Sequence, residues 1–272
     1  MKALTFSLLA EPPERLDLSG LTPALLAGLT KLQIARLTIG SGRHPASVGD
    51  VFKVSGTDPG NIVFAGGSSR FDGVGARMQG GTIRVDGDAG RQAGRKMSGG
   101  SLLIQGNAGD HAGSGMAYGR LEIGGRAGDF LGGPLAGELA GMAGGLLIVR
   151  GKAGDYAGDR LRRGIIAILK GCGAYAGCRM LAGTLVVAGR TGAMPGYLMK
   201  RGSLLFDRRP EHLSPTFVQC GEPDIAFSGL FDRFLLQEKI LDRPLLGDRP
   251  GRYGGDNAVL GKGEILFRRR AG

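Results

Sequence analysis

The sequence has no tryptophan, three cysteines and few aromatic residues, and its 12 prolines are few beside 53 glycines. Glycine in such excess without abundant proline excludes a collagen-like chain. The plentiful aliphatic residues exclude an intrinsically disordered chain, which lacks the apolar side chains needed for a core. No apolar stretch reaches the length of a membrane span. We therefore expect the 272 residues to fold around a substantial core, without a membrane partner.

The cysteines, Cys172, Cys178 and Cys220, are odd in number and lack C-x-x-C spacing. A disulfide framework would need an even number, and a structural zinc site would need closely spaced ligands. We interpret them as small buried residues in a reducing cytoplasm. The sequence therefore predicts a cytoplasmic protein and no metal site.

A repeat of nineteen residues runs through the middle of the chain. One glycine column lies at residues 75, 94, 113, 132, 158, 177 and 196, and another at residues 81, 100, 119, 145, 164, 183 and 202. Between them runs an apolar column that is methionine in all units but one: Met78, Met97, Met116, Met142, Leu161, Met180 and Met199. One insertion of about seven residues, between Gly132 and Gly141, interrupts the spacing. A repeat of this length predicts a stacked architecture.

Each unit also carries two aliphatic or aromatic residues separated by one position: Ile83/Val85, Leu102/Ile104, Leu121/Ile123, Leu147/Val149, Ile166/Ile168, Leu185/Val187 and Leu204/Phe206. This alternation predicts a short strand with both side chains on one face. The remaining dozen or so residues are too few for a helical crossover, whereas glycine permits tight corners. We therefore predict an all-β fold: a single-stranded parallel β-helix of about seven or eight coils with methionines filling its interior.

The repeat divides the chain into an N-terminal cap (residues 1–47), a repeat domain (48–207) and a C-terminal cap or extension (208–272). Caps are expected because the ends of a stack expose unpaired strand edges. Thr22-Pro23 predicts the start of a short helix that ends at Gly28. A second helix, folded over the last coil, is predicted by the helical spacing of Leu230, Phe231, Phe234 and Leu235.

The position between the two inward residues of each strand should face outward. In the first coils it is mixed, with Arg84, Leu103 and Glu122, but in the last four it is apolar: Ile148, Ala167, Val186 and Leu205. An apolar outer face has to be covered. The C-terminal segment and a partner subunit are both candidates for that cover.

Residue patterns that indicate catalysis are absent. His44, His111 and His212 are scattered, and the positions matching His111 in other units carry Gln92, Leu131, Tyr156 and Tyr175. The glycine-rich stretches lack a phosphate-binding motif and its strand-turn-helix context. We therefore predict no catalytic residue, no bound cofactor and no metal ligand in this chain.

Basic residues show more order. Residues 61–214 hold 20 Lys and Arg against 11 Asp and Glu, which accounts for +9 of the net charge of +11. The position before the methionine column carries Arg77, Lys96, Arg160 and Arg179, and basic residues also follow it at Arg162, Arg163, Lys200 and Arg201. This row is either a solvated face or a docking strip for an acidic subunit or a polyanionic ligand. Nucleic acid is disfavoured because no aromatic residues are interleaved with the charges.

The unit from Gly75 to Gly90, continued by residues 94–100, reads G-x-x-M-x-G-G-x-I-x-V-x-G-x-A-G. This repeat, over residues 48–206, resembles the C-type subunit of the bacterial formyltransferase/hydrolase complex. It is also similar to the C-type subunit of formylmethanofuran dehydrogenase and to the C-terminal (GXGXG) domain of glutamate synthase. The length of the chain favours a C-type subunit, and the 26 arginines against 9 lysines favour the bacterial complex.

The resemblance implies a role in one-carbon metabolism, as in methylotrophy. Such a complex moves a formyl group from formyl-tetrahydromethanopterin to a methanofuran-type carrier and hydrolyses it to formate. The metal-dependent hydrolase, the formyltransferase and a further B-type subunit would be the partners, and this chain would be a scaffold without activity of its own. The alternatives are the C-type subunit of an archaeal-type tungsten or molybdenum formylmethanofuran dehydrogenase and a glutamate synthase-like domain.

Overall fold

The computed structural model describes residues 2–40, 45–221 and 225–269, and it is mostly β. The N-terminal elements are β1 (Ala3–Leu8), β2 (Leu16–Asp17), α1 (Pro23–Leu26), α2 (Lys31–Ala35), α3 (Val48–Val51), β3 (Phe52–Ser55), β4 (Asp58–Ala65) and β5 (Phe71–Asp72). The repeat contains β6 (Thr82–Val85), β7 (Ser98–Ile104), β8 (Tyr118–Ile123), β9 (Ala143–Val149), β10 (Arg163–Ile168), β11 (Thr184–Val187) and β12 (Arg201–Phe206). The C-terminal elements are β13 (Val218–Gln219), α4 (Ile225–Gln237), β14 (Gly251–Gly255) and β15 (Lys262–Phe267).

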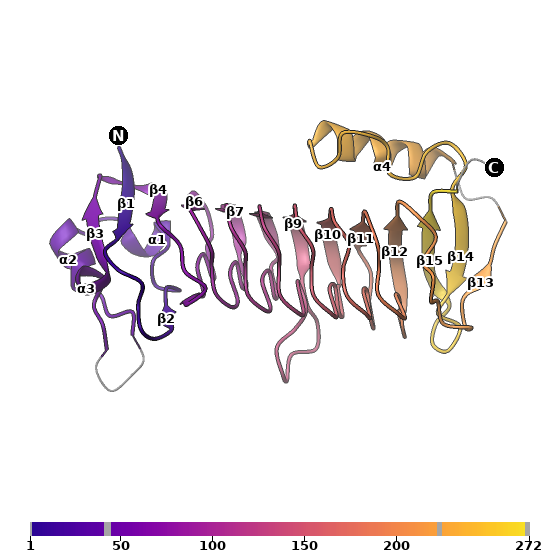
Figure 1. Cartoon of the computed structure of the whole chain (residues 1–272), viewed down its shortest axis with the longest axis horizontal. Helices are drawn as coiled ribbons and strands as arrows, with labels where there is room; N and C mark the ends of the chain where they lie inside the picture. The colour runs from indigo at the N-terminus through magenta and orange to yellow at the C-terminus, as the bar shows by residue number, and fades with distance from the viewer. Residues whose placement is uncertain (1, 41–44, 222–224, 270–272) are drawn as a thin grey trace.

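One 13-stranded sheet runs the length of the molecule (Figure 1). Its order is β13-β14-β15-β12-β11-β10-β9-β8-β7-β6-β4-β1-β3, so the sheet is open, with β13 and β3 at its edges. The strands from β4 to β12 pair in parallel with their sequence neighbours in the sheet. A parallel neighbour requires the chain to return to the same end of the sheet after each strand.

The register of the sheet follows the nineteen-residue period. Ile83 pairs with Leu102, Leu102 with Leu121, and Leu121 with Leu147, so equivalent side chains form continuous rows. The inward strand positions and the methionine column are at most 1% exposed, which confirms both as core. Both glycine columns have positive φ throughout, as at Gly119 (φ 91°), where an added Cβ would lie 2.6 Å from the carbonyl oxygen of Gly100. The glycines are therefore required by backbone conformation and by close approach between coils.

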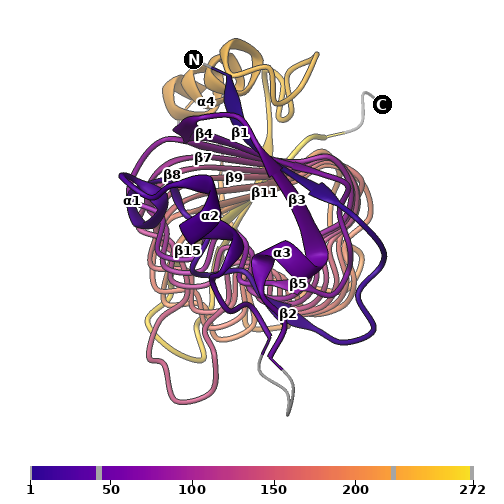
Figure 2. The ribbon, with the colours of Figure 1, turned by 90° about the vertical axis from the view of Figure 1, so that its left-hand side faces the viewer.

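The return segments stack on one another as well (Figure 2). A second row of parallel bridges joins Ala89, Ala108, Ala127, Ala153, Cys172 and Thr191. Side chains continue this row: Oδ1 of Asp110 accepts from the backbone N–H of Asp129 (3.0 Å), and Oδ1 of Asp129 accepts from that of Asp155 (2.8 Å). Backbone N–H groups of the return segments are thus paired with side chains of the neighbouring coil.

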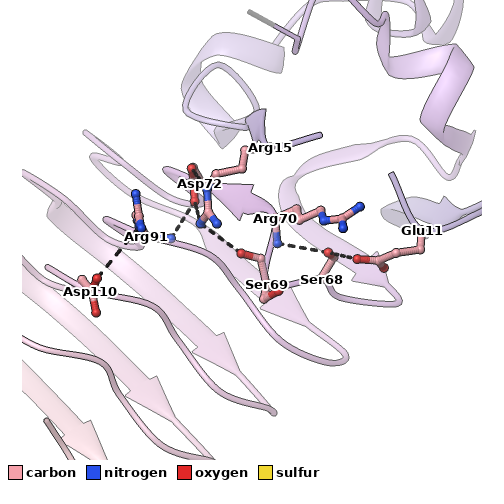
Figure 3. A network of polar contacts seen from close by, with 8 residues as sticks. All are labelled: Glu11, Arg15, Ser68, Ser69, Arg70, Asp72, Arg91 and Asp110. Carbon is pink, nitrogen blue, oxygen red and sulfur yellow. Dashed lines mark hydrogen bonds and ion pairs between the residues drawn. The ribbon is translucent and has the colours of Figure 1, made fainter. Parts of the chain in front are cut away.

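The N-terminal segment closes one end of the stack. Strand β1 pairs in parallel with β4 and antiparallel with β3, and Phe6, Phe52, Phe64 and Phe71 pack together with ring centroids 5.1–5.9 Å apart. Helix α1 begins after Thr22 and ends before Gly28, as predicted. Arg15 also binds Asp72 in a bidentate pair and donates to the Ser69 carbonyl, which ties the segment before α1 to the first return segment (Figure 3).

The C-terminal segment closes the other end and returns to the sheet. Strand β15 pairs in parallel with β12, placing Ile265 beside Leu204, and it pairs antiparallel with β14. The edge strand β13 has only two residues, which limits further pairing. The core at this end includes the ring pair of Tyr253 and Phe267, whose centroids are 5.6 Å apart.

Helix α4 is formed by the residues with helical spacing, but it does not fold over the last coil as predicted. It lies along the outer face of the sheet (Figure 1) because the apolar outer row needs cover there. Leu235 packs in one buried cluster with Ile148, Ala167, Val186 and Leu205. The C-terminal segment, rather than a partner protein, therefore covers this row. No helix among the described residues is long and apolar enough to cross a membrane.

Candidate functional site

The predicted basic row lies at a corner of the return segments. Arg77, Lys96, Arg160 and Arg179 all have positive φ, between 49° and 58°, and their N–H groups donate to carbonyl oxygens of the next coil. This left-handed conformation is uncommon for residues other than glycine. The positive φ angles could not be inferred from the residue types, because arginine and lysine do not favour this conformation. Hydrogen bonds between coils offset its strain.

The insertion after Gly132 folds back over part of this row. Oε1 of Glu138 lies 2.8 Å from Nη2 of Arg95 and 3.1 Å from Nζ of Lys96, and the Glu138 carbonyl accepts from Nη1 of Arg160 (2.9 Å). Partial burial opposes ionisation of Glu138, but the Leu135 N–H and the two cations hold its pKa below the usual range. Lys96 and Arg160 therefore already have partners within the chain.

Arg179 also has a partner within the chain. Its Nε and Nη2 bind the two carboxylate oxygens of Asp159 at 3.0 and 2.8 Å, and the Asp159 side chain is only 2% exposed. This hydrogen bond to Asp159 raises the pKa of Arg179. Arg179 thus neutralises a buried carboxylate and is poorly placed to serve as a free docking charge.

The remaining predicted basic residues are exposed and have no ion pair among the described residues: Arg77, Arg162, Arg163, Lys200 and Arg201. All but Arg77 lie beside the starts of β10 and β12. The pairing of β12 with β15 places Lys262 directly beside Arg201. We call Arg162, Arg163, Lys200, Arg201 and Lys262 the basic edge.

The basic edge places like charges on adjacent strands, and no described acid pairs with them. Arg201 and Lys262 are partners in the parallel register, an arrangement that disfavours the folded chain in isolation. Lys262 was missed in the sequence because only the return of β15 to β12 brings it there. An acidic surface placed over this edge would relieve the repulsion.

An aromatic ladder runs beside the basic corner. The rings of His111, Phe130, Tyr156 and Tyr175 stack at centroid separations of 4.9–5.0 Å and are nearly parallel. The residue in register with His111 is Phe130, so the match to Leu131 was wrong by one position. Their positive φ angles place these residues at equivalent corners of successive coils.

Three rings of the ladder line a surface cavity of about 570 Å³, together with Tyr197, Arg179, Cys178, Met194 and Leu198. Tyr197 meets Tyr175 there edge to face, with centroids 6.0 Å apart. The expectation that aromatics and charges are separate is therefore wrong at this corner. The ladder residues recur with the repeat, so the sequence could have revealed them. Tyr197 does not follow the repeat, and only the fold brings it beside Tyr175.

Cys172, Cys178 and His111 have structural surroundings. Burial raises the pKa of the Cys172 thiol to about 12 and that of Cys178 to about 11, which disfavours the reactive thiolate. Among the described residues, no three His, Cys, Asp or Glu side chains are grouped to hold a metal ion. His111 belongs to the aromatic ladder, and His44 lies outside the described residues.

A polar network near the N-terminal end has a structural explanation. Asp72 accepts from the guanidinium of Arg15 and from the backbone N–H of Arg91 (2.7 Å), while Arg91 approaches Asp110 at 3.9 Å (Figure 3). Each acid therefore joins adjacent coils or fixes the N-terminal segment. These contacts leave the basic edge, four residues of which were predicted from the sequence, as the candidate functional surface.

Comparisons with known proteins agree with the fold and the resemblance. No protein-family model matches the chain. The C-type Fhc subunit of the formyltransferase/hydrolase complex of Methylorubrum extorquens is 55% identical over 262 residues, which cover 96% of this chain and 98% of that protein. A chain in the X-ray crystal structure of the formyltransferase/hydrolase complex (FhcABCD) from Methylorubrum extorquens, in complex with methylofuran, superposes with a TM-score of 0.93.

That structural match has 42% sequence identity and covers 98% of this chain and all of the other. Agreement at this level extends through the repeat, the N-terminal segment and the C-terminal segment. The chain belongs to the family of C-type subunits of the formyltransferase/hydrolase complex.

Proposed function

We propose that this chain is the non-catalytic, C-type scaffold subunit of a formyltransferase/hydrolase complex that acts in one-carbon metabolism. The 55% identity over nearly the whole of both proteins supports this function. The single structural observation that carries the scaffold role is the basic edge: exposed cations on adjacent strands that no described acid pairs with. Its partners would be the hydrolase, the formyltransferase and a B-type subunit.

The chemistry of the proposed complex is the transfer of a formyl group from formyl-tetrahydromethanopterin to a methanofuran-type carrier, followed by hydrolysis to formate. The related crystal structure was determined with methylofuran, which supports such a carrier. The metal would belong to the hydrolase subunit. No finding supports the alternatives of a tungsten or molybdenum dehydrogenase or a glutamate synthase-like domain.

The scaffold is a single-stranded parallel β-helix with GXGXG-type repeats, which we place in residues 48–207 between the caps 1–47 and 208–272. The parallel strand rows and the second row of bridges in the return segments support this description. A stack of this kind presents equivalent residues at regular spacing along one side. We also propose a cytoplasmic location, in keeping with the three free cysteines.

Two uses of the basic edge are open to experiment. It can bind an acidic face of a partner subunit, or it can hold an anionic chain of the carrier, because guanidinium groups bind carboxylates in either setting. We favour docking of a partner because the edge follows strand starts across the sheet and does not line the cavity beside the aromatic ladder. Of the eight basic residues predicted from sequence, Lys96, Arg160 and Arg179 are better assigned to stability.

A charge-reversal experiment separates these uses. In the complete complex, Arg163→Glu with Arg201→Glu should weaken association of this chain with its partners by about tenfold or more. The matched control is Arg36→Glu with Arg126→Glu, since both arginines are exposed and without an ion pair among the described residues. An intact complex with weakened carrier binding would instead show that the basic edge holds the anionic chain of the carrier.

The catalytic part of the proposal has its own test. The purified 272-residue chain should neither transfer nor hydrolyse a formyl group, whereas the complete complex should do both. Activity of the isolated chain would refute the scaffold role. Equal complex assembly by the Arg163/Arg201 variant and its control, with normal carrier binding, would refute the role of the basic edge.

A further inference from the structure

A strongly basic cavity, which was not predicted from the sequence, lies at the C-terminal end of the stack. It has a volume of about 650 Å³, and six arginines contribute to its lining: Arg190, Arg208, Arg209, Arg243, Arg268 and Arg269. Only Asp207 and Glu211 contribute negative charge, so six cations against two acids leave a charge of +4. The cavity is separate from the basic edge.

Four segments of the sequence build this cavity. Arg190 comes from a return segment, Arg208 and Arg209 follow β12, and Arg268 follows β15, which pairs with β12. Arg243 lies in the segment after α4. The arginines therefore meet only because β15 and the segment after α4 return to the repeat.

Several of the guanidinium groups are held in position. Nε of Arg268 donates to the Leu245 carbonyl (2.9 Å), and its Nη2 donates to the Pro244 carbonyl. Arg209 lies over the ring of Tyr253, 5.5 Å from the centroid. These contacts fix cations without neutralising them, which lowers the entropy cost of binding an anion.

The acids in the cavity neutralise only part of this charge. Asp207 pairs with Nε of Arg208 (3.2 Å) and accepts from the backbone N–H of Gly189 (3.0 Å). Arg190, Arg243 and Arg269 are exposed and form no ion pair within the described ranges. Concave clusters of one charge sign raise the local concentration of counter-ions.

We propose that this cavity binds a small multivalent oxyanion with two or more carboxylate or phosphate groups. The volume falls within the range of small-molecule sites, about 300–1,000 Å³, and is far larger than a single inorganic phosphate requires. Guanidinium forks bind carboxylate and phosphate oxygens bidentately, so several arginines from different segments suit a ligand with separated anionic groups. Phe267 supplies an apolar part of the wall for the ligand's carbon frame.

Isothermal titration of the full chain with pyrophosphate and with citrate tests the proposal at about 150 mM salt, where weak surface attraction is screened. At least one probe should bind with 1:1 stoichiometry and a Kd below about 1 mM. Tighter binding of pyrophosphate would identify phosphate as the favoured group, and tighter binding of citrate would identify carboxylate. Arg190→Gln with Arg243→Gln should raise that Kd by about tenfold or more, because two charge-assisted contacts are lost.

The matched control is Arg36→Gln with Arg126→Gln, which removes the same charge away from the cavity and should leave the Kd within about twofold. If the cavity double variant does not fold, Arg269→Gln replaces it with the same expected direction. Absence of saturable binding by both probes would overturn the proposal. Equal weakening in the cavity and control variants would overturn it as well, since it would show a general effect of net charge.

Discussion

The ion pair between Asp159 and Arg179 provides the sharpest test of how the basic row is built. Replacing Arg179 with Gln removes the cation while the Asp159 carboxylate, 2% exposed, stays buried without its ion-pair partner. Breaking a fully buried pair costs about 3–5 kcal/mol, whereas an exposed pair contributes about 0–1 kcal/mol. Arg179 is 41% exposed, so solvent screening reduces the effect, and we expect a loss of about 2 kcal/mol.

Urea unfolding followed by circular dichroism measures this loss at about 25 °C. Arg162→Gln is the control, because Arg162 is exposed and unpaired among the described residues, and its effect should stay within about 0.5 kcal/mol. Adding Asp159→Asn to Arg179→Gln should restore part of the lost stability, because the unpaired carboxylate is removed. Equal stability of the Arg179→Gln and Arg162→Gln variants would refute the assignment of Arg179 to the fold.

Three further predictions concern the sheet, its corners and its thiols. Leu235→Ala should lower the free energy of unfolding by about 3 kcal/mol in urea titrations, because it empties a fully buried site under α4, whereas Leu236→Ala at a 36% exposed position should cost less. Gly119→Ala should destabilise the chain in the same assay by at least about 1 kcal/mol, because φ is 91° and the new Cβ would meet a carbonyl oxygen. At about pH 8, a thiol reagent should modify Cys172 and Cys178 in the unfolded chain but not in the folded chain, since burial raises both pKa values well above that pH.

The register of the sheet could be read from the sequence because one physical requirement recurs in every coil. Inward strand residues such as Leu102 and Leu121 need apolar neighbours at the strand spacing, and corner glycines need positive φ. Both requirements recur every nineteen residues, so both are visible in the sequence. The apolar outer row was predictable for the same reason, and its need for cover indicated that another segment packs on it.

The contacts outside the period could not be read in this way. Glu138 belongs to the insertion, which has no equivalent in other coils, so its pairing with Lys96 leaves no periodic signal. Lys262 and Arg268 come beside the repeat only through the return of β15. Charged residues vary between coils without disturbing the backbone. Their partners therefore depend on side-chain geometry, which leaves no periodic pattern in the sequence.

Affinity isolation from the native cell tests the central proposal most directly. The full chain, tagged at one terminus, should be recovered together with a hydrolase and a formyltransferase in fixed ratio, and the isolated assembly should release formate from a formyl-loaded carrier. Protein identification by mass spectrometry and quantification of formate provide the two measurements. Recovery of the chain alone, or with partners that carry no formyl chemistry, would contradict its assignment as the C-type scaffold of a formyltransferase/hydrolase complex.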